Sequence, residues 1–392
     1  MRVGIDVTCW CNQRGFGRFT RELVTALVSL PSEDEYVLFA DRQTAEAADL
    51  PESCRVVIAK TSAAVAVAAS AGSRRSIKDV LAMRRMVQRE PLDVMFFPAV
   101  YSYFPITRGI PCVVTFHDII AETLPRLVFG SWRSRLFWQL KCRLAARRAD
   151  LLVTVSLASK KGLMCHFGLS DDRIAVISEA PASSFAEATG SRQVDAEVLR
   201  RHGLEPGKRY ILYVGGISPH KNLDTLIEAF ALVRKDARLE DIHLVLVGDW
   251  AGDVFYTCYE ELCILVERYG LGRAVHFTGF IPDEDLVHLY TACQAFVLPS
   301  YLEGFGLPAV EAMACGAAVV ASNVGSLPEV LDGAGELFDP HDAAALVGCL
   351  KRILRDSVYQ RELQTRSLQR ALDFSWETSA RQMRNIFDTM KA

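Results

Sequence analysis

The sequence lacks an apolar run long enough to span a membrane. Its longest weakly polar stretch is residues 63–71, whereas a spanning helix needs about 20 apolar residues. The first residues, MRVGIDVTCWC, carry charge within a strand-like pattern and do not resemble a signal peptide. We therefore expect a cytoplasmic protein.

Paired cysteine motifs are also missing. The 11 cysteines are scattered, only Cys9 and Cys11 lie close together, and no CxxC pair exists. This pattern argues against a structural zinc site, a redox motif and a disulfide framework. Reduced thiols packed as small apolar side chains are expected instead.

Repeats and low-complexity tracts are absent, and the overall composition is ordinary for globular proteins. Half of the residues are hydrophobic and 23% are charged, which argues against disorder. The length of 392 residues suggests two or three domains, each able to bury a core of its own.

Charge is distributed unevenly along the chain. Residues 1–185 carry 24 Lys and Arg against 18 Asp and Glu, whereas residues 186–392 carry 20 against 29. The positive excess is concentrated in residues 73–90 and in residues 131–148, the second of which contains no acidic residue. Such stretches attract anions, whether lipid head groups, nucleic acid or phosphorylated substrates.

Apolar runs of strand length alternate with segments of helical periodicity along nearly the whole chain. The expected strands are residues 2–7, 36–40, 55–58, 93–97, 112–116, 151–155, 174–177, 210–214, 243–247, 275–278, 295–298, 318–321 and 336–338. The expected helices are residues 18–30, 77–89, 132–148, 157–167, 222–235, 256–268, 283–292, 308–314 and 343–355. Nearly continuous apolar strands separated by helices indicate parallel sheets covered on both faces.

The alternation restarts after residues 181–192, a stretch rich in Pro, Ala, Ser and Gly that is typical of a linker. We therefore predict an α/β fold with two doubly wound, Rossmann-like domains, residues 1–185 and 186–375, facing each other across a cleft. In such folds ligands bind at the carboxyl ends of the strands, close to helix N-termini.

Two glycine-containing loops connect an expected strand to an expected helix. The first contains Gly15 and Gly17 and can bring backbone amides close to a phosphate, although a simple tight turn explains it equally well. It is not a GxGxxG dinucleotide motif. The second, GGISPHKN, places Lys221 beside the helix start, with Asn222 as the expected N-cap.

The segment PSYLEGFGLPAVEAMACG carries the strongest signal. It follows an apolar strand, passes two glycines and enters a helix through Pro308. Glu303 lies in the loop and Glu311 one turn into the helix, so both are expected at the strand ends. Carboxylates there can accept hydrogen bonds from pairs of sugar hydroxyls.

Two further groups allow more than one interpretation. His117, at the end of the strand CVVTFHDI, can act as a general base, bind a sugar hydroxyl, or be a satisfied strand-end residue. Asp283 and Asp285 fit a loose Asp-x-Asp metal pattern, but they open a helix after Pro282, where acidic residues favour the helix dipole. No metal site is expected.

Together these motifs resemble those of retaining glycosyltransferases of family 4, which have the GT-B architecture. The resemblance rests on the E-x7-E block from Glu303 to Glu311, GGISPHKN, VHFTGFIPDEDL and FHD, which occur in family order over nearly the whole chain. It implies a nucleotide-sugar donor held by the second domain and an acceptor held by the first. It also implies that the last helix, residues 376–392, packs back on the first domain.

The resemblance assigns roles by position. The implied catalytic residues are His117, Lys221 and Glu303. The implied donor-binding residues are Gly15, Gly17, Gly216, Lys221, Phe280, Ile281, Glu303, Phe305, Gly306, Leu307 and Glu311. Among them Lys221 is expected to bind the diphosphate, Glu311 the ribose, and Phe280 with Ile281 to border the nucleobase. Gly216 stands where many relatives carry an arginine that also binds the diphosphate.

The implied activity is retaining, metal-independent transfer of a hexose in envelope polysaccharide assembly, with no cofactor and no nucleic-acid partner. GGISPHKN and ISEAPASSF resemble the mannosyltransferase branch, so the expected donor is GDP-mannose, and UDP-glucose remains an alternative. A nucleotide-sugar epimerase, a phosphorylase, an NAD-linked dehydrogenase and a non-catalytic nucleotide-sugar sensor are weaker alternatives. The acceptor is expected to be a glycan or a lipid-linked glycan.

Residues 132–148 combine apolar and basic side chains. Leu136, Phe137, Leu140 and Leu144 recur at helical spacing, with arginines beside them and Trp132 and Trp138 suited to a lipid interface. Two interpretations remain open: the apolar stripe packs on the sheet of the first domain, or the helix and residues 74–89 bind the inner face of an anionic membrane.

Overall fold

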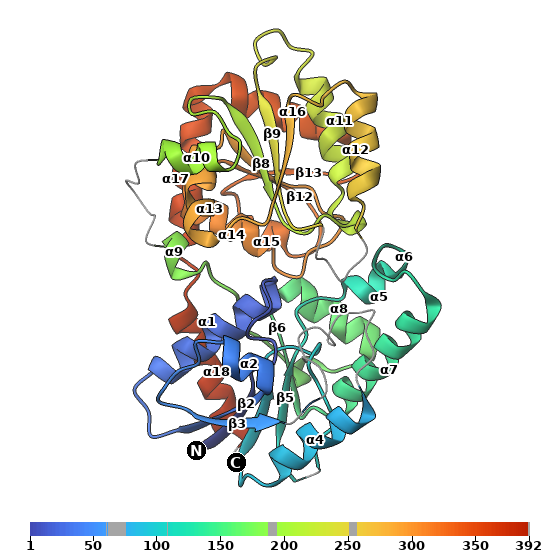
Figure 1. Ribbon diagram of the computed structural model, residues 1–392, viewed down its shortest axis with the longest axis vertical. Coiled ribbons are helices and arrows are strands. Elements are labelled where there is room, and N and C mark those ends of the chain that lie inside the picture. The colour runs from blue at the N-terminus through green and yellow to red at the C-terminus, as the bar shows by residue number, and fades with distance from the viewer. Residues whose placement is uncertain (60, 62–75, 108, 187–193, 251–256, 391–392) are drawn as a thin grey trace. The chain divides into compact units, whose positions relative to one another are not determined.

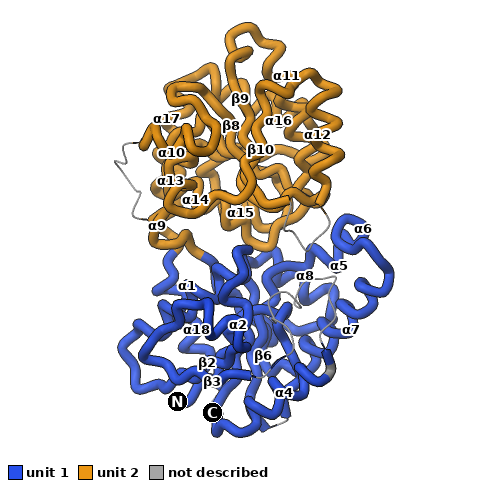
Figure 2. The backbone as a smooth tube through the Cα atoms, in the orientation of Figure 1, with its two compact units in different colours: residues 1–179, 375–392 blue, residues 180–374 orange. Residues whose placement is uncertain are grey.

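The computed structural model describes residues 1–59, 61, 76–107, 109–186, 194–250 and 257–390. The chain divides into two compact units, unit 1 with residues 1–179 and 375–392 and unit 2 with residues 180–374 (Figure 2). The division falls a few residues before the boundary expected from composition. The reason is Phe185, which is fully buried in unit 2 with its ring centroid 5.7 Å from that of Tyr290.

Unit 1 is built on a seven-stranded parallel sheet with the strand order β3-β2-β1-β4-β5-β6-β7. Its strands are β1 (Arg2–Asp6), β2 (Glu35–Asp41), β3 (Arg55–Ala59), β4 (Val94–Phe97), β5 (Cys112–Thr115), β6 (Leu151–Thr154) and β7 (Ile174–Val176). Strands β4 and β5 are buried along their whole length, as expected for strands with helices on both faces.

Helices cover both faces of this sheet. They are α1 (Gly15–Ser29), α2 (Arg42–Ala47), α4 (Ile77–Gln88), α5 (Ile120–Thr123), α6 (Pro125–Val128), α7 (Trp132–Arg148), α8 (Leu157–Phe167) and α18 (Trp376–Met390). Apolar side chains of α4, α7 and α8 join one core cluster with Met95 and Phe97 of β4. Phe96, which alternates with them along the strand, packs instead against Phe387 of α18.

The C-terminal helix α18 belongs to unit 1, where it lies along α1 (Figure 1). Trp376 meets Phe19 edge to face with the ring centroids 5.9 Å apart, and Arg384 Nε lies 3.0 Å from the Asp34 carboxylate. Ser379 Oγ also donates a 2.7 Å hydrogen bond to the Ser178 carbonyl oxygen. These contacts fix the end of the chain on the first sheet.

Unit 2 repeats the architecture with a six-stranded parallel sheet in the order β10-β9-β8-β11-β12-β13. Its strands are β8 (Tyr210–Val214), β9 (His243–Val247), β10 (Val275–Gly279), β11 (Ala295–Leu298), β12 (Val319–Ser322) and β13 (Glu336–Phe338). Its helices are α9 (Ser183–Ala186), α10 (Ala196–Arg201), α11 (Leu223–Val233), α12 (Tyr259–Arg268), α13 (Asp283–Ala292), α14 (Leu307–Ala314), α15 (Leu327–Leu331), α16 (Ala343–Arg355) and α17 (Ser357–Ala371).

The predicted fold class is confirmed, because each unit is a doubly wound parallel sheet of the Rossmann type. In unit 1 the strand order reverses between β1 and β4, and in unit 2 it reverses between β8 and β11. The loops that follow two such neighbouring strands turn toward opposite faces of the sheet, which leaves room for a ligand between them. The loops after these strands are therefore where each unit is expected to bind ligands.

One expectation about a helix is wrong. The stripe of Leu136, Phe137, Leu140 and Leu144 on α7 does not pack on the sheet, because all four side chains are exposed. The buried face of α7 consists of Trp138, Cys142, Ala145 and Ala146. Trp138 is therefore a core residue, whereas Trp132 is 70% exposed. Arg74 and Arg75 of the other basic stretch lie outside the described residues.

Candidate functional site

The loops that follow β8 and β11 form the centre of the candidate site in unit 2. The two strands are hydrogen-bonded neighbours, so the segments that leave their carboxyl ends start side by side. The loop after β8 contains GGISPHKN and the loop after β11 contains the E-x7-E block. The amide of Tyr301 donates to the carbonyl oxygen of His220 at 2.9 Å, which joins the two loops directly.

Asn222 anchors the first loop but does not cap a helix through its side chain, contrary to the sequence prediction. Its backbone is left-handed, with φ of 58°, and its amide nitrogen Nδ2 donates to the carbonyl oxygens of Pro299 and Pro340 at 2.9 and 2.8 Å. A fully buried asparagine is thereby satisfied by neighbouring loops. It holds the preceding Lys221 at the strand ends.

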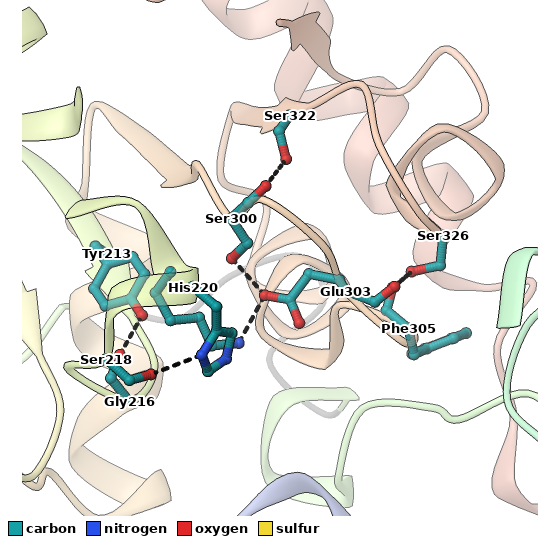
Figure 3. A network of polar contacts seen from close by, with 10 residues as sticks. Tyr213, Gly216, Ser218, His220, Ser300, Glu303, Phe305, Ser322 and Ser326 are labelled. Carbon is teal, nitrogen blue, oxygen red and sulfur yellow. Dashed lines mark hydrogen bonds and ion pairs between the residues drawn. The ribbon is translucent and has the colours of Figure 1, made fainter. Parts of the chain in front are cut away.

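Lys221 and Glu303 meet at this switch point. The Lys221 Nζ atom lies 2.7 Å from Glu303 Oε1, and the two side chains are 17% and 8% exposed. Ser300 Oγ donates to the same carboxylate oxygen at 2.6 Å (Figure 3). Ser322 at the end of β12 in turn donates to the Ser300 carbonyl oxygen at 2.6 Å. Serines that follow β11 and end β12 therefore hold Glu303, and with it the Lys221–Glu303 pair, in position.

The start of helix α14 is fixed by glycine and serine. Gly306 has φ of 94°, and a Cβ atom added there would lie 2.6 Å from Leu327 Cδ2, so a side chain is excluded both by conformation and by space. Ser326 Oγ donates to the Phe305 carbonyl oxygen at 2.8 Å (Figure 3). Pro308 has no N–H and the Ala309 amide donates to the Gly306 carbonyl oxygen at 2.8 Å, so the Leu307 amide is the first donor of α14 and stands at its positive dipole end. This end of the helix is suited to binding phosphate oxygens.

Glu311 and the pair of residues after β10 lie on other elements of unit 2. Glu311 is 3% exposed in α14, and Tyr290 OH of α13 donates to its Oε2 at 3.1 Å. Ile281 is buried, whereas the neighbouring Phe280 is 56% exposed and presents its ring to solvent. The structure thus brings Lys221 and Glu303 into contact, while Glu311 contacts Tyr290.

Gly216 has a different environment from Gly306. The nearest atom to an added Cβ would be Ser218 Oγ at 3.8 Å, so the backbone there leaves space for a side chain. The carbonyl oxygen of Gly216 accepts a 2.8 Å hydrogen bond from Tyr213 OH. Burial raises the pKa of Tyr213 well above its ordinary value, so this hydroxyl remains a donor. No neighbouring atom therefore requires glycine at position 216 by contact with a Cβ atom.

In unit 1, His117 lies at the carboxyl end of β5 with both ring nitrogens in contact. Nε2 lies 2.9 Å from the Pro98 carbonyl oxygen, and Nδ1 lies 3.3 Å from Glu179 Oε1. The edge of the Phe19 ring packs on the imidazole, with the ring centroids 4.7 Å apart. The Pro98 carbonyl can only accept, so Nε2 carries a proton. His117 is thus a satisfied residue at the functional edge of this sheet.

The two glycines after β1 lie in the first turn of α1, which begins at Gly15, and not in a loop before the helix as the sequence predicted. A Cβ atom added at Gly17 would lie 2.0 Å from the Asn12 carbonyl oxygen, so this turn requires glycine there. An added Cβ at Gly15 would meet no atom within 4 Å. Arg21 fixes the preceding loop by donating to the carbonyl oxygens of Trp10 and Asn12 at 2.6 and 2.8 Å. Of the two positions, Gly15 is therefore the open one.

Sequence reasoning missed the residues that orient the charged groups. Ser300 and Tyr290 bond to Glu303 and Glu311, and Glu179 bonds to His117. Only Ser300 could have been identified from the sequence, because it lies between the end of β11 and Glu303. Tyr290 and Glu179 are separated from their partners by 21 and 62 residues, so only the fold reveals them.

No group of three or more His, Cys, Asp or Glu side chains able to hold a metal ion occurs among the described residues. Asp285 of the Asp-x-Asp pattern is 3.0 Å from Arg201 Nη1 and 2.8 Å from His202 Nε2. Across the described helices, none is long and apolar enough to cross a membrane.

Comparison with known proteins gives matches in both halves of the chain. The family description "Glycosyltransferase Family 4" matches residues 13–180, and "Glycosyl transferases group 1" matches residues 195–370. The chain is 35% identical to O-antigen chain mannosyltransferase B of Escherichia coli over 277 residues, which cover 70% of this chain and 69% of that one.

The match to the serotype-specific mannosyltransferase WbdA of Escherichia coli is 34% identical over 67% of this chain but spans only 32% of that protein. Among solved structures, sucrose-phosphate synthase of Thermosynechococcus elongatus superimposes with a TM-score of 0.76 at 21% identity, covering 100% of this chain and 99% of that one. This likeness concerns the fold. The chain therefore belongs to the glycosyltransferases, with a family 4 region in its first half and a group 1 region in its second.

Proposed function

We propose that this glycosyltransferase moves mannose from GDP-mannose to a glycan or lipid-linked glycan acceptor during assembly of an envelope polysaccharide. The observation that carries the proposal is the Lys221–Glu303 pair, braced by Ser300 at the switch point of unit 2. The choice of mannose is supported by the two mannosyltransferases of Escherichia coli that the chain resembles.

The geometry suggests how a nucleotide-sugar would be bound. A diphosphate at the first turn of α14 would attract Lys221 away from Glu303, because two phosphate charges outweigh one carboxylate. Ser300 would keep Glu303 in place while its partner moves, leaving the carboxylate to accept hydrogen bonds from sugar hydroxyls. We assign Lys221 to the diphosphate and Glu303 to the sugar.

The remaining donor contacts follow the same arrangement. Glu311, oriented by Tyr290, is assigned to the ribose hydroxyls, and the exposed Phe280 ring with Ile281 to the nucleobase. The amides of Phe305, Gly306 and Leu307 are assigned to the phosphate at the start of α14. Unit 2 is accordingly the proposed donor domain, and unit 1 the proposed acceptor domain.

In unit 1, Gly15 and Gly17 are proposed to approach the diphosphate and His117 the donor sugar. His117 would have to open its hydrogen bond to Pro98 or its contact with Glu179 before binding a hydroxyl. His117, Lys221 and Glu303 are the proposed catalytic residues.

The proposed chemistry is transfer with retention and without a metal ion. The bond between the sugar C1 and the phosphate oxygen breaks, and the electron pair leaves with the diphosphate, whose charge Lys221 and the amides of α14 stabilise. The acceptor oxygen bonds to C1 on the same face, and its proton passes to the departing phosphate oxygen. Atoms and charge balance without a further reactant.

The test is a donor panel with product analysis. GDP-mannose, UDP-glucose and related donors are added singly, and binding is measured as a rise in unfolding temperature, because a ligand of the folded state stabilises it. Release of nucleotide and the anomeric configuration of the product are then followed by NMR. Stabilisation by GDP-mannose and formation of an α-mannoside are expected.

Other outcomes contradict distinct parts of the proposal. Turnover of UDP-glucose alone would replace the donor, and an inverted anomer would refute retention. Donor binding without nucleotide release would indicate a sensor, whereas an isomerised nucleotide-sugar would indicate an epimerase.

A further inference from the structure

Helix α7 exposes a large apolar surface. Trp132, Leu136, Phe137, Leu140 and Leu144 are 70, 58, 51, 67 and 37% exposed. The opposite face of the same helix is buried through Trp138, Cys142, Ala145 and Ala146. Leaving five large apolar side chains in water on one helix is unfavourable, and such surfaces mark interaction sites.

The charged residues of α7 itself are all basic. Residues 132–148 contain no Asp or Glu. The exposed basic residues are Arg133, Arg135, Arg143, Arg147 and Arg148. None of these five guanidinium groups pairs with a carboxylate in the described part of the chain, although many other arginines of the protein do, as in the pairs Arg42–Glu46 and Arg381–Glu377.

The two kinds of side chain are interspersed along the helix. Four of the five exposed apolar residues lie between Trp132 and Leu140, where Arg133 and Arg135 also lie, whereas Leu144 lies among Arg143, Arg147 and Arg148 in the second half. Helix α4 contributes to the same core cluster as α7 and exposes Lys78, Leu81 and Arg85. An apolar patch bordered by unpaired cations complements a surface with anionic head groups above an apolar interior.

Two hydrogen bonds join α7 to the segments that follow β4 and β5 of unit 1. Trp138 Nε1 donates to Glu122 Oε1 at 2.7 Å, and Lys141 Nζ donates to the Tyr101 carbonyl oxygen at 3.2 Å. Glu122 lies on the segment that follows β5 and His117. Strands β5 and β6 are parallel, so the chain must return from the carboxyl end of β5 to the amino end of β6, and α7 makes this return. The N-terminal half of α7 is therefore at the carboxyl edge of the sheet.

We propose that α7 is a membrane-binding helix that attaches unit 1 to an anionic lipid surface, with the exposed apolar side chains inserted and the exposed arginines contacting the head groups. A second copy of the chain is less suited to this face, because two such surfaces would bring unpaired arginines together. Binding at this place would hold the carboxyl edge of unit 1 beside the membrane, where a lipid-linked acceptor resides. The inference goes beyond the proposed donor chemistry and does not depend on it.

The experiment is co-sedimentation of the full chain with phosphatidylcholine vesicles, with and without phosphatidylglycerol, at low and high salt and without donor. The parent protein should bind the phosphatidylglycerol vesicles at low salt and dissociate at high salt. Each arginine near anionic lipid contributes roughly fivefold to partitioning, so Arg143→Gln/Arg147→Gln/Arg148→Gln should weaken binding by about 100-fold.

The apolar contribution is tested with Leu136→Gln/Phe137→Gln/Leu140→Gln, which should weaken binding by about tenfold or more. The matched control is Ile264→Gln/Val358→Gln/Leu372→Gln in unit 2, where the three original side chains are 66, 68 and 73% exposed. Its binding should equal that of the parent. A cooperative thermal unfolding transition like that of the parent, measured on every variant without donor, shows that the fold persists.

Absence of the parent from phosphatidylglycerol pellets at low salt would overturn the inference, as would unchanged binding by both α7 variants. If the apolar variant instead converts an oligomer to a monomer in the absence of vesicles, the face joins two copies and the membrane proposal is wrong. If the protein hydrolyses the donor but does not bind vesicles, the membrane inference is wrong and the proposed function is unaffected.

Discussion

Glu122 should make the stability of this protein depend on pH between about 4.5 and 7. Glu122 lies on α5, and its Oε1 accepts a hydrogen bond from Trp138 Nε1 of α7 at 2.7 Å. Burial, followed by the charge of Asp118, raises the pKa of Glu122 from its ordinary 4.5 to about 7. The hydrogen bond from Trp138 opposes this rise but is the smaller effect.

The magnitude follows from linkage between protonation and folding. Between pH 4.5 and 7 the unfolded chain releases the Glu122 proton while the folded protein retains it. The free energy of unfolding therefore falls as the pH rises through this window, by about 3 kcal/mol at 1.36 kcal/mol for each tenfold change. Below the window both states are protonated, and above it both are ionised, so the contribution is constant there.

Glu122→Gln removes the titration and keeps an oxygen to accept from Trp138. The variant should match the parent near pH 4.5 and exceed it by about 3 kcal/mol near pH 8, which is roughly 6–12 °C in Tm for a unit of this size. The assay is urea and thermal unfolding of both proteins across this range, with exposed Glu52→Gln as the control for loss of a surface charge. A stability difference between parent and Glu122→Gln that does not change with pH would refute the reasoning.

Three further predictions concern unit 2. Lys221→Ala should lower donor turnover by about 10²–10³-fold, because it removes the cation that stabilises the leaving diphosphate; turnover equal to that of the parent in a steady-state nucleotide-release assay would reject the assignment. Gly306→Ala should destabilise the protein by about 1–3 kcal/mol in urea unfolding, because φ is 94° and Leu327 lies 2.6 Å from the added Cβ. Gly216→Ala, whose added Cβ has its nearest neighbour at 3.8 Å, is the matched control, and equal losses would contradict the steric argument. Donor turnover should continue in excess chelator, and activity that stops and returns on addition of magnesium or manganese would disprove the metal-independent mechanism.

Much of the secondary structure could be predicted because its signals are local. All 13 expected strands are present within one or two residues of their predicted ends, and the helices at 132–148, 157–167, 283–292 and 343–355 have the predicted bounds. Continuous apolar runs and helical periodicity are properties of neighbouring residues. Helix α17 was missed because its sequence is mostly polar, with only Leu363, Ser367 and Ala371 buried.

The candidate site was predictable only in part. The motifs located Lys221 and Glu303 on separate loops, but their ion pair joins residues 82 positions apart and requires β8 and β11 to be neighbours. Strand order depends on how helices cross the sheet, which no local pattern encodes. The same holds for Tyr290 beside Glu311 and for Glu179 beside His117.

Helix α7 shows most clearly what the sequence determines and what the tertiary structure determines. The sequence by itself determined that residues 132–148 form a helix, that one stripe of it is apolar, and that its charge is wholly positive. It could not determine which face is buried, because Trp138, Cys142, Ala145 and Ala146 form a second face that is also compatible with a core. The tertiary structure decided this, since the smaller alanines allow close approach to the sheet and Trp138 finds a hydrogen-bond acceptor in Glu122. The larger apolar side chains of the other stripe consequently face outward.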